Sequence, residues 1–306
     1  MKKIIISIIL LLSLFVYPVN SLQLDFPLGL NAKIDQWRIY TSFSYNHIAG
    51  ISKQNNDSYN FVNLNDLGIS SIYMFNYSLG LEYGWDEYLT LSTEIPARLT
   101  SITTMNNING IKNCSNNILL GGIYNFRGEL GGFDIKFALA LPTEGTGLDV
   151  INNFPKSGKR SIGINVTPRF IFPLLSNDID MPGIGSYSLP LLLGAISIGF
   201  EYNFLSFDQS PIVGPAIWPS LGVIYLVIHK QFHLGLFLSD KYTFTGSEKY
   251  SSNNLFFILP YLSWYPHPNI SIELQPYLSF QTPSSIGNGA FLQPVNIMVK
   301  FEFTFP

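Results

Sequence analysis

The feature that most constrains the fold is a period of two in hydrophobicity. In the last twelve residues, VNIMVKFEFTFP, large apolar side chains occupy every second position from Val295 to Phe305, and the residues between them are Asn296, Met298, Lys300, Glu302 and Thr304. Successive side chains of a β-strand point to opposite faces. The pattern therefore predicts a strand with one apolar face and one face that carries the polar and charged groups.

The same period recurs along the whole chain after residue 21, and no helical segment is evident. We expect twelve strands, each of about the length that crosses a membrane, about 9–11 residues. They lie near residues 37–48, 69–83, 88–100, 117–126, 133–142, 161–172, 190–203, 216–229, 232–242, 254–265, 270–280 and 294–305.

Alternation alone fits two kinds of fold. In a soluble sandwich the apolar face points to the core, whereas in an outer-membrane barrel it points to lipid and the polar face lines the interior. Composition favours the barrel: 47% of the residues are hydrophobic and only 12% are charged, against about 25% charged in a typical soluble domain.

The connections between the segments also favour a barrel. They alternate between short ones, such as 84–87 and 266–269, and longer ones of about 10 to 20 residues, the arrangement of short periplasmic turns and long extracellular loops. Residues 173–189 are the exception, since a long connection stands where a short turn is expected. Aromatic residues gather beside the short turns, as expected of an interfacial girdle: Trp37, Tyr83, Trp85, Tyr88, Phe126, Phe133, Trp264 and Tyr265.

The last strand completes the prediction. Its continuous apolar face would make a poor free edge, and pairing it with the first strand removes that edge. We therefore predict an all-β fold, a transmembrane antiparallel up-and-down β-barrel of about 12 strands (alternatives 10 or 14). Outer-membrane proteins resemble one another in such a last strand, which the barrel assembly machinery reads; here its aromatic residues are Phe301, Phe303 and Phe305.

The N-terminus predicts export. Lys2 and Lys3 precede an apolar run over 4–16, and Pro18 ends it, which is typical of a secretory signal peptide. We expect a signal peptide at 1–21, an N-terminal periplasmic segment or plug at 22–36, and the barrel at 37–306. These features predict the bacterial outer membrane as the location.

Charges within the segments fall almost entirely on the face opposite the apolar one. We predict that they line a pore, with His233 and Lys241 on the same face; the alternative is an ionic plug in which they only pair with one another. Arg38 and Glu302 are predicted to pair where the first and last strands close the barrel. The predicted pore-lining residues are Arg38, Glu82, Glu94, Arg98, Asp134, Lys136, Arg169, Glu201, Glu273, Lys300 and Glu302.

Prolines 96, 168, 260 and 276 fall inside predicted strands, where proline cannot donate to the ladder. Pro260 and Pro276 lie at similar distances on either side of the turn at 266–269, so we expect them opposite each other. Two missing donors would weaken the wall there and could let an apolar solute pass sideways into lipid; the alternative is a pair of tolerated bulges.

Two stretches carry a resemblance to a known family: LEYGWDEYLTLSTEIP (81–96) and NNILLGGIYNFRGELGGFDIKFALALPTEGTG (116–147). They are similar to the MetA-pathway of phenol degradation family, outer-membrane barrels labelled as transporters. The resemblance implies passage of small, apolar or aromatic compounds and brings no functional residues with it.

The leading functional prediction is thus an outer-membrane channel for passive or gated uptake of small solutes, with membrane lipid around it and no cofactor, metal or nucleic-acid partner. A net charge of −3 argues against nucleic acid. One alternative is a closed structural or adhesive barrel that acts through its loops at 49–67 and 101–117. Another is a lipid hydrolase in which His47 activates Ser71 on the outer face.

Overall fold

The computed structural model describes residues 34–306 apart from ten short ranges, 56–57, 106–108, 116–117, 129–130, 142–160, 182–184, 207–213, 229–230, 245–252 and 283–288. Within the described part, β-strands account for nearly all regular structure, with one 3-10 helix, η1, at Asn65–Leu67. No described helix is long and apolar enough to cross a membrane.

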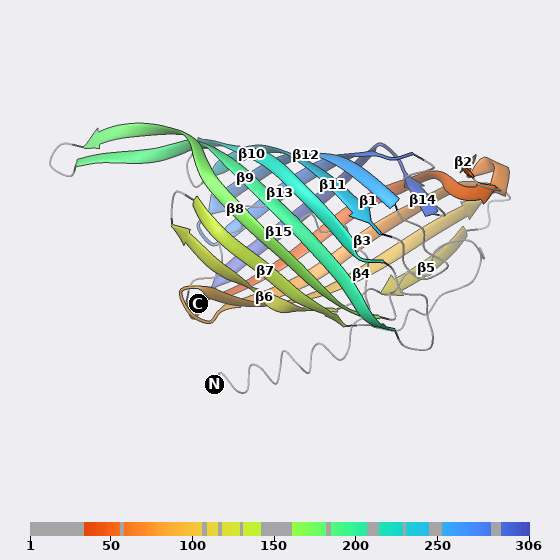
Figure 1. The fold of residues 1–306 in the computed structure, drawn as a ribbon, viewed down its shortest axis with the longest axis horizontal. Helices are drawn as coiled ribbons and strands as arrows, with labels where there is room; N and C mark the ends of the chain where they lie inside the picture. Colours follow the sequence, from red (N-terminus) through yellow and green to blue (C-terminus); the bar gives the residue numbers. More distant parts are fainter. Residues whose placement is uncertain are drawn as a thin grey trace.

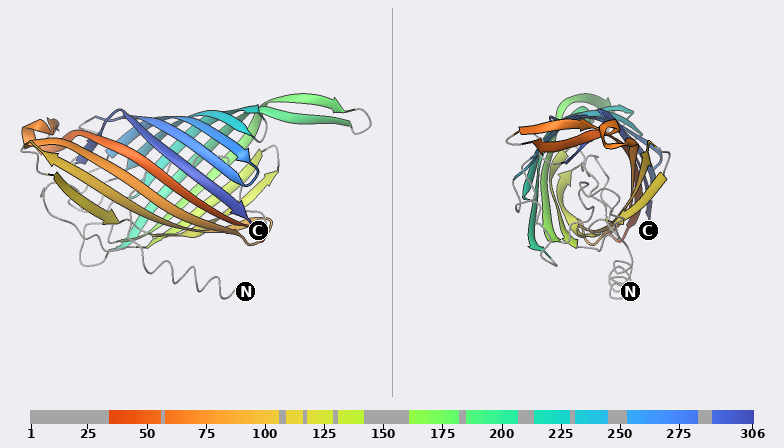
Figure 2. Two further views of the ribbon diagram at one scale, coloured as in Figure 1. Left: turned by 180° about the vertical axis from the view of Figure 1, so that it is seen from behind. Right: turned by 90° about the vertical axis from the view of Figure 1, so that its right-hand side faces the viewer.

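Twelve antiparallel strands form one closed barrel, as predicted (Figures 1 and 2). Each neighbours the next one along the ring, and β1 closes it by pairing with β15 on one side and β3 on the other. The wall strands are β1 (Trp37–Asn55), β3 (Ile69–Gly84), β4 (Leu89–Thr104), β6 (Ile118–Gly128), β7 (Gly131–Leu141), β8 (Ser161–Met181), β9 (Gly185–Ser206), β10 (Ala216–Ile228), β11 (Phe232–Thr243), β12 (Asn253–His267), β13 (Ile270–Phe280) and β15 (Val295–Phe305).

Three further short strands lie outside the predicted set. They are β2 (Ser58–Asn63), β5 (Asn109–Ser115) and β14 (Gly289–Leu292), and each pairs with the far end of a wall strand. All three belong to long connections, so part of those connections extends the sheet at one end of the barrel (Figure 1).

The closing register is continuous from Trp37 opposite Phe305 to Tyr45 opposite Ile297. The apolar face of the last strand therefore has a neighbour on both sides, and the edge that the sequence would otherwise expose is removed.

Alternate side chains have opposite exposure, and the apolar ones are outside. On β3, Phe75 is 45% exposed and Leu79 is 40% exposed, whereas Asn76 and Ser78 are 6% and 1% exposed. On this strand large apolar side chains point outward and polar side chains point inward, the arrangement of an outer-membrane barrel.

Short turns and the C-terminus share one end of the barrel, and β2 and β14 lie at the other (Figure 1). In outer-membrane barrels the short-turn end faces the periplasm. At this end the segment 173–189 departs from the expectation of a loop. It continues β8 and β9 as a paired hairpin, from Ser176 opposite Pro190 to Met181 opposite Gly185, which projects beyond the barrel (Figure 2).

Strands run through the prolines, with local gaps in the ladder. Pro96 stays paired with Ser78 and Pro168 with Ile135 on their β3 and β7 sides. On its other side Pro168 interrupts the ladder to β9 between Val166 and Arg169, as expected of a residue without an N–H, and the predicted strands continue through both prolines.

Candidate pore lining

An arginine and a glutamate face each other on the interior of β1 and β3, near the short-turn end. Arg38 and Glu82 occupy paired positions, and Arg38 Nε donates a hydrogen bond to Glu82 Oε2 at 2.9 Å while Nη2 also contacts that oxygen. Their side chains are 4% and 7% exposed. Charge-assisted bonds of this kind are needed here because a buried, unpaired charge is costly.

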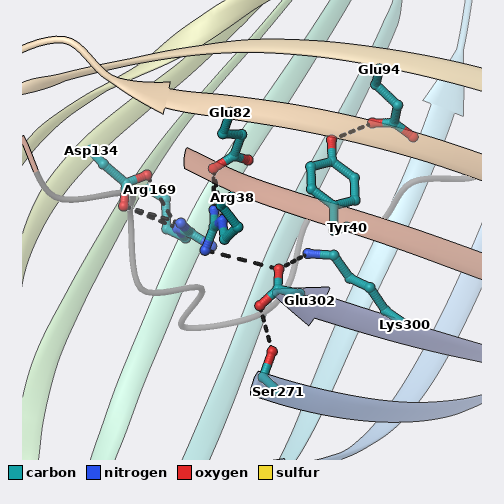
Figure 3. A network of polar contacts seen from close by, with 9 residues as sticks. All are labelled: Arg38, Tyr40, Glu82, Glu94, Asp134, Arg169, Ser271, Lys300 and Glu302. Carbon is teal, nitrogen blue, oxygen red and sulfur yellow. Dashed lines mark hydrogen bonds and ion pairs between the residues drawn. The ribbon is translucent and has the colours of Figure 1, made fainter. Parts of the chain in front are cut away.

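Glu302 joins three strands across the closing seam (Figure 3). Its carboxylate accepts hydrogen bonds from Lys300 Nζ at 2.5 Å and from Ser271 Oγ at 2.6 Å. Arg38 Nη1 lies 3.9 Å from Glu302 Oε1, so the predicted pairing of Arg38 with Glu302 is present, although Glu82 is the nearer partner of Arg38.

Tyr40 and Tyr261 extend this cluster to two further carboxylates. Tyr40 Oη donates to Glu94 Oε2 at 3.0 Å, and Tyr261 Oη donates to Glu273 Oε1 at 3.4 Å. The ammonium of Lys300 lies 4.6 Å from the centroid of the Tyr40 ring, a cation–π contact. We call the whole set the charged network: Arg38, Tyr40, Glu82, Glu94, Ser271, Glu273, Lys300 and Glu302.

Gly80 lets Tyr40 lie against the barrel wall. The two residues are opposite each other on β3 and β1, and a Cβ on Gly80 would overlap the Tyr40 ring. The absence of a side chain at this position therefore holds the phenol flat, where it reaches Glu94.

Two more ion pairs lie on the interior, farther around the ring. Arg169 on β8 donates to Asp134 on β7, with Nη2 to Oδ2 at 3.1 Å, and Asp134 is 1% exposed. Lys241 Nζ lies 3.4 Å from Glu201 Oε2 and 4.9 Å from the centroid of the Trp218 ring.

Two predicted pore-lining residues remain, Lys136 and Arg98. Lys136 lies on the same face of β7 as Asp134, opposite Thr167 of β8. Arg98 pairs through its backbone with Asn76, and its side chain lies outside the described structure.

The charged network contains four carboxylates, Glu82, Glu94, Glu273 and Glu302, and two cationic side chains, Arg38 and Lys300. Its excess of acceptors is met by hydroxyl donors from tyrosine and serine. A pore at this level would therefore present a surface rich in carboxylate oxygens, and such rings favour cations.

A second interior surface, which we call the apolar wall, was not predicted. It spans β8 to β13, and several of its members are fully buried; Phe237, Phe257 and Leu259 are 1%, 0% and 0% exposed. Its rings pack edge to face, with centroids 6.2 Å apart for Phe237 and Tyr261. The members are Ile171, Leu193, Ala195, Ile224, Leu226, Phe237, Phe257, Leu259, Tyr261 and Tyr277.

One signal for this wall was present in the sequence. The stretch FFILPYL at 256–262 is apolar on both faces, unlike the alternating pattern at the C-terminus. In a barrel with a uniformly polar interior every strand would alternate. The loss of alternation therefore indicates strands with an apolar inner face.

The aromatic girdle is present in part. Tyr88, Phe126 and Trp264 are 44%, 55% and 48% exposed beside the short turns. The assignment of Tyr265 to it is wrong, because Tyr265 follows the outward Trp264 and so lies on the inner face, where its ring is 8% exposed and packs against His233 at 5.3 Å between centroids.

The other predicted features have these outcomes. His47 stacks on Tyr73 at 4.8 Å between ring centroids, which packs the imidazole against an aromatic ring. Of the predicted plug, residues 22–33 lie outside the described structure, and Asp35 binds the end of β3, its N–H to Gly84 O at 2.9 Å and its carboxylate to the Tyr83 hydroxyl.

Comparison with known proteins supports the fold. No family model matches the chain, and no curated protein matches it. Among solved structures, the COG4313 outer membrane channel from Pseudomonas putida F1 superposes with a TM-score of 0.62 at 10% identity, covering 92% of this chain and 99% of that one. The NanC porin gives a TM-score of 0.48 at 8% identity, covering 87% of this chain and 98% of that one.

Proposed function

We propose that this chain is an outer-membrane channel for gated uptake of small apolar or aromatic solutes. The observation that supports this proposal most is that the interior has an apolar side, the apolar wall, and a polar side, the charged network. The apolar wall over β8 to β13 is packed in this state and would contact the apolar part of a solute once the interior opens, and the charged network on β1, β3, β4, β13 and β15 supplies hydrogen-bond partners and charge. Binding sites for small molecules combine such apolar surface with a few placed polar groups.

Burial of the charged network supports gating rather than a permanently wide pore. Arg38 and Glu302 have side chains that are 4% and 5% exposed, so water reaches them little in this state. Conduction then requires these side chains to rearrange. Side-chain motion of this kind is a smaller change than strand separation, and it leaves the barrel intact.

The likeness to the COG4313 channel adds support from the fold, and the resemblance at 81–96 and 116–147 agrees with a transport role. The second candidate is a closed structural or adhesive barrel. The same buried ion pairs favour it, because a packed ionic interior also closes a barrel of this size.

Swelling of proteoliposomes distinguishes the two candidates. Phenylglycine and arabinose have nearly the same mass, and both cross lipid slowly. We expect the protein to admit both and to admit phenylglycine faster, because its ring can contact the apolar wall. Swelling with neither solute, from protein that is folded by gel mobility, would contradict the channel and favour the closed barrel.

A matched pair of variants tests the role of the apolar wall in that assay. Phe237→Ser removes a ring of the wall and should reduce the preference for phenylglycine about threefold, as expected for loss of one aromatic contact. Phe75→Ser removes a ring from the outer face and should leave the preference unchanged.

A further inference from the structure

The ladder between β12 and β13 is interrupted midway along the wall. Ile258 pairs with Leu278, and Leu262 pairs with Leu274; this register places Pro260 opposite Pro276. No pairing joins residues 259–261 to 275–277 in this described stretch. In an antiparallel ladder, residues that exchange two backbone hydrogen bonds alternate with facing residues that exchange none. Loss of one bonded pair therefore also leaves the facing residues on either side of it without a hydrogen bond next to them. Since neither proline has an N–H, one whole pair of bonds is missing.

The weakness is confined to one side of each strand. Pro260 remains paired with Leu236 of β11, and Pro276 remains paired with Ile297 of β15. β12 therefore stays paired with β11 and β13 stays paired with β15, and at this level only the hydrogen bonds between β12 and β13 are missing. We call this stretch, 258–262 of β12 with 274–278 of β13, the proline seam.

Single prolines elsewhere in the described wall leave smaller gaps. On β8 the ladder to β9 passes from Val166 opposite Phe200 to Arg169 opposite Ser197, around Pro168. On β10 the ladder to β11 skips two positions, 218 and 219, the second of which is Pro219. In each case the facing residue still has its own N–H, so the proline seam differs in lacking donors on both strands.

The outer face of the seam is apolar, and its inner face is apolar apart from Gln275, which is 2% exposed. Leu259, Tyr261 and Tyr277 face the interior, are 0%, 3% and 7% exposed, and belong to the apolar wall. On the outer face, Ile258, Leu262, Leu274 and Leu278 are half-buried. An apolar solute that crossed the seam would therefore meet apolar side chains along the way.

The direct route along the barrel axis is less favourable for such a solute. Glu273 lies three residues from Pro276 toward the short turn, and it faces Lys300 on β15, next to Glu302. An apolar molecule that passed this level would have to displace hydrogen-bond partners from buried charges without replacing them, which is costly.

We propose that the proline seam is a lateral exit, through which an apolar solute that has entered the interior leaves the barrel into the hydrocarbon of the membrane. This inference rests on the proposed channel function. Parting β12 from β13 at Pro260 and Pro276 breaks no backbone hydrogen bond at that position, so the strands separate there more easily than at a complete ladder. The solute moves from the apolar wall to lipid and avoids the charged network.

The test follows arrival of an apolar probe in lipid. 1-N-phenylnaphthylamine fluoresces on entering phospholipid, and intact Gram-negative cells that express the full chain should admit it faster than cells without it. Pro260→Val with Pro276→Val restores both donors and should slow arrival about tenfold, because opening then breaks two hydrogen bonds. Pro219→Val restores only one donor on another seam and should leave the rate unchanged.

A reversible disulfide between β12 and β13, which we call the staple, provides a second variant that does not depend on the proline changes. In a Cys114→Ser background, Leu259→Cys with Tyr277→Cys places two thiols on facing inner positions of the seam. Oxidation should slow arrival of the probe, and reduction should restore it. Ser220→Cys with Ser239→Cys is the control, since these hydroxyls are 2.8 Å apart at a paired position of the β10–β11 ladder, next to the gap at 218 and 219; its oxidation should have no effect.

Ion conductance measured on the same variants separates failure of the exit from failure of the channel. Slower arrival in the valine variant with unchanged conductance, and slower arrival on oxidation of the staple with equal conductance before and after oxidation, support the lateral exit. Unchanged arrival in both the folded valine variant and the oxidised staple overturns it and leaves the channel standing. If the wild type shows neither conductance nor faster arrival, the proposed function fails and the exit fails with it.

Discussion

At the scale of single residues, Glu302 connects three strands of the charged network. It contacts Lys300, Ser271 and Arg38 from three strands. The buried carboxylate of Glu302 stabilises the closure of the barrel between β1 and β15 only while its partners are present. Without them it would be a buried charge that has no counterpart.

Removing the charge at this position should therefore cost stability. We expect Glu302→Gln to lower the free energy of unfolding by about 3 kcal/mol, as when one partner of a buried pair is lost. Glu201→Gln affects a pair whose lysine is 24% exposed and therefore partly hydrated, and it should cost less than Glu302→Gln. Urea titration of the lipid-reconstituted protein, followed by tryptophan fluorescence, measures both. Equal losses would contradict the special role of Glu302.

At the scale of the strands, the positions of all twelve wall strands could be predicted from the sequence, because a period of two and the turn residues between the segments are local signals. The inward side of each predicted charge follows from the same alternation. The partner of each charge could not be predicted, since pairing depends on register between strands that are distant in sequence: Arg38 meets Glu82 because β1 and β3 align there.

Other features depend on contacts that no local pattern encodes. The apolar wall collects side chains from six strands, and β2, β5 and β14 form by pairing onto strands that are already in place. The hairpin at 173–189 could not be predicted, because its alternation is weak and Pro173 and Pro190 flank it. In contrast, it could be predicted that Pro260 and Pro276 face each other, because a short turn sets the register of a hairpin.

The projecting part of the β8–β9 hairpin should be dispensable for barrel stability. In the described pairings, β7 contacts β8 no farther than Ile171, and β10 contacts β9 no earlier than Leu192. We expect replacement of residues 177–188 by an Asn-Gly turn to change the free energy of unfolding by less than about 0.5 kcal/mol. The shift of the folded band on unheated gels, combined with urea titration, checks this. A loss of several kcal/mol would mean that the hairpin supports the wall.

At the scale of the whole molecule, the outer surface is the opposite of that of a soluble protein. Large apolar side chains such as Phe43, Phe75 and Leu221 are 48%, 45% and 54% exposed, while the interior holds ion pairs. This distribution is stable only if hydrocarbon surrounds the barrel, and it accounts for the low charged fraction of the sequence.

A charge placed on the outer surface should be penalised according to its depth. We expect Leu79→Arg, in the middle of β3, to cost about 2–4 kcal/mol, and Tyr88→Arg, in a short turn, to cost about 0–1 kcal/mol. Unfolding from phospholipid vesicles measures the difference. Similar costs at the two positions would contradict the placement of the membrane around the middle of the strands.

The proposed channel function requires that the interior of the barrel conduct ions. The most direct measurement is single-channel conductance of the refolded chain, from residue 22 onward, in planar lipid bilayers. We predict discrete current steps, with a preference for cations from the carboxylates of the charged network that weakens in Glu302→Gln. Silent bilayers containing protein that is correctly folded by gel mobility would contradict the channel and indicate a closed barrel.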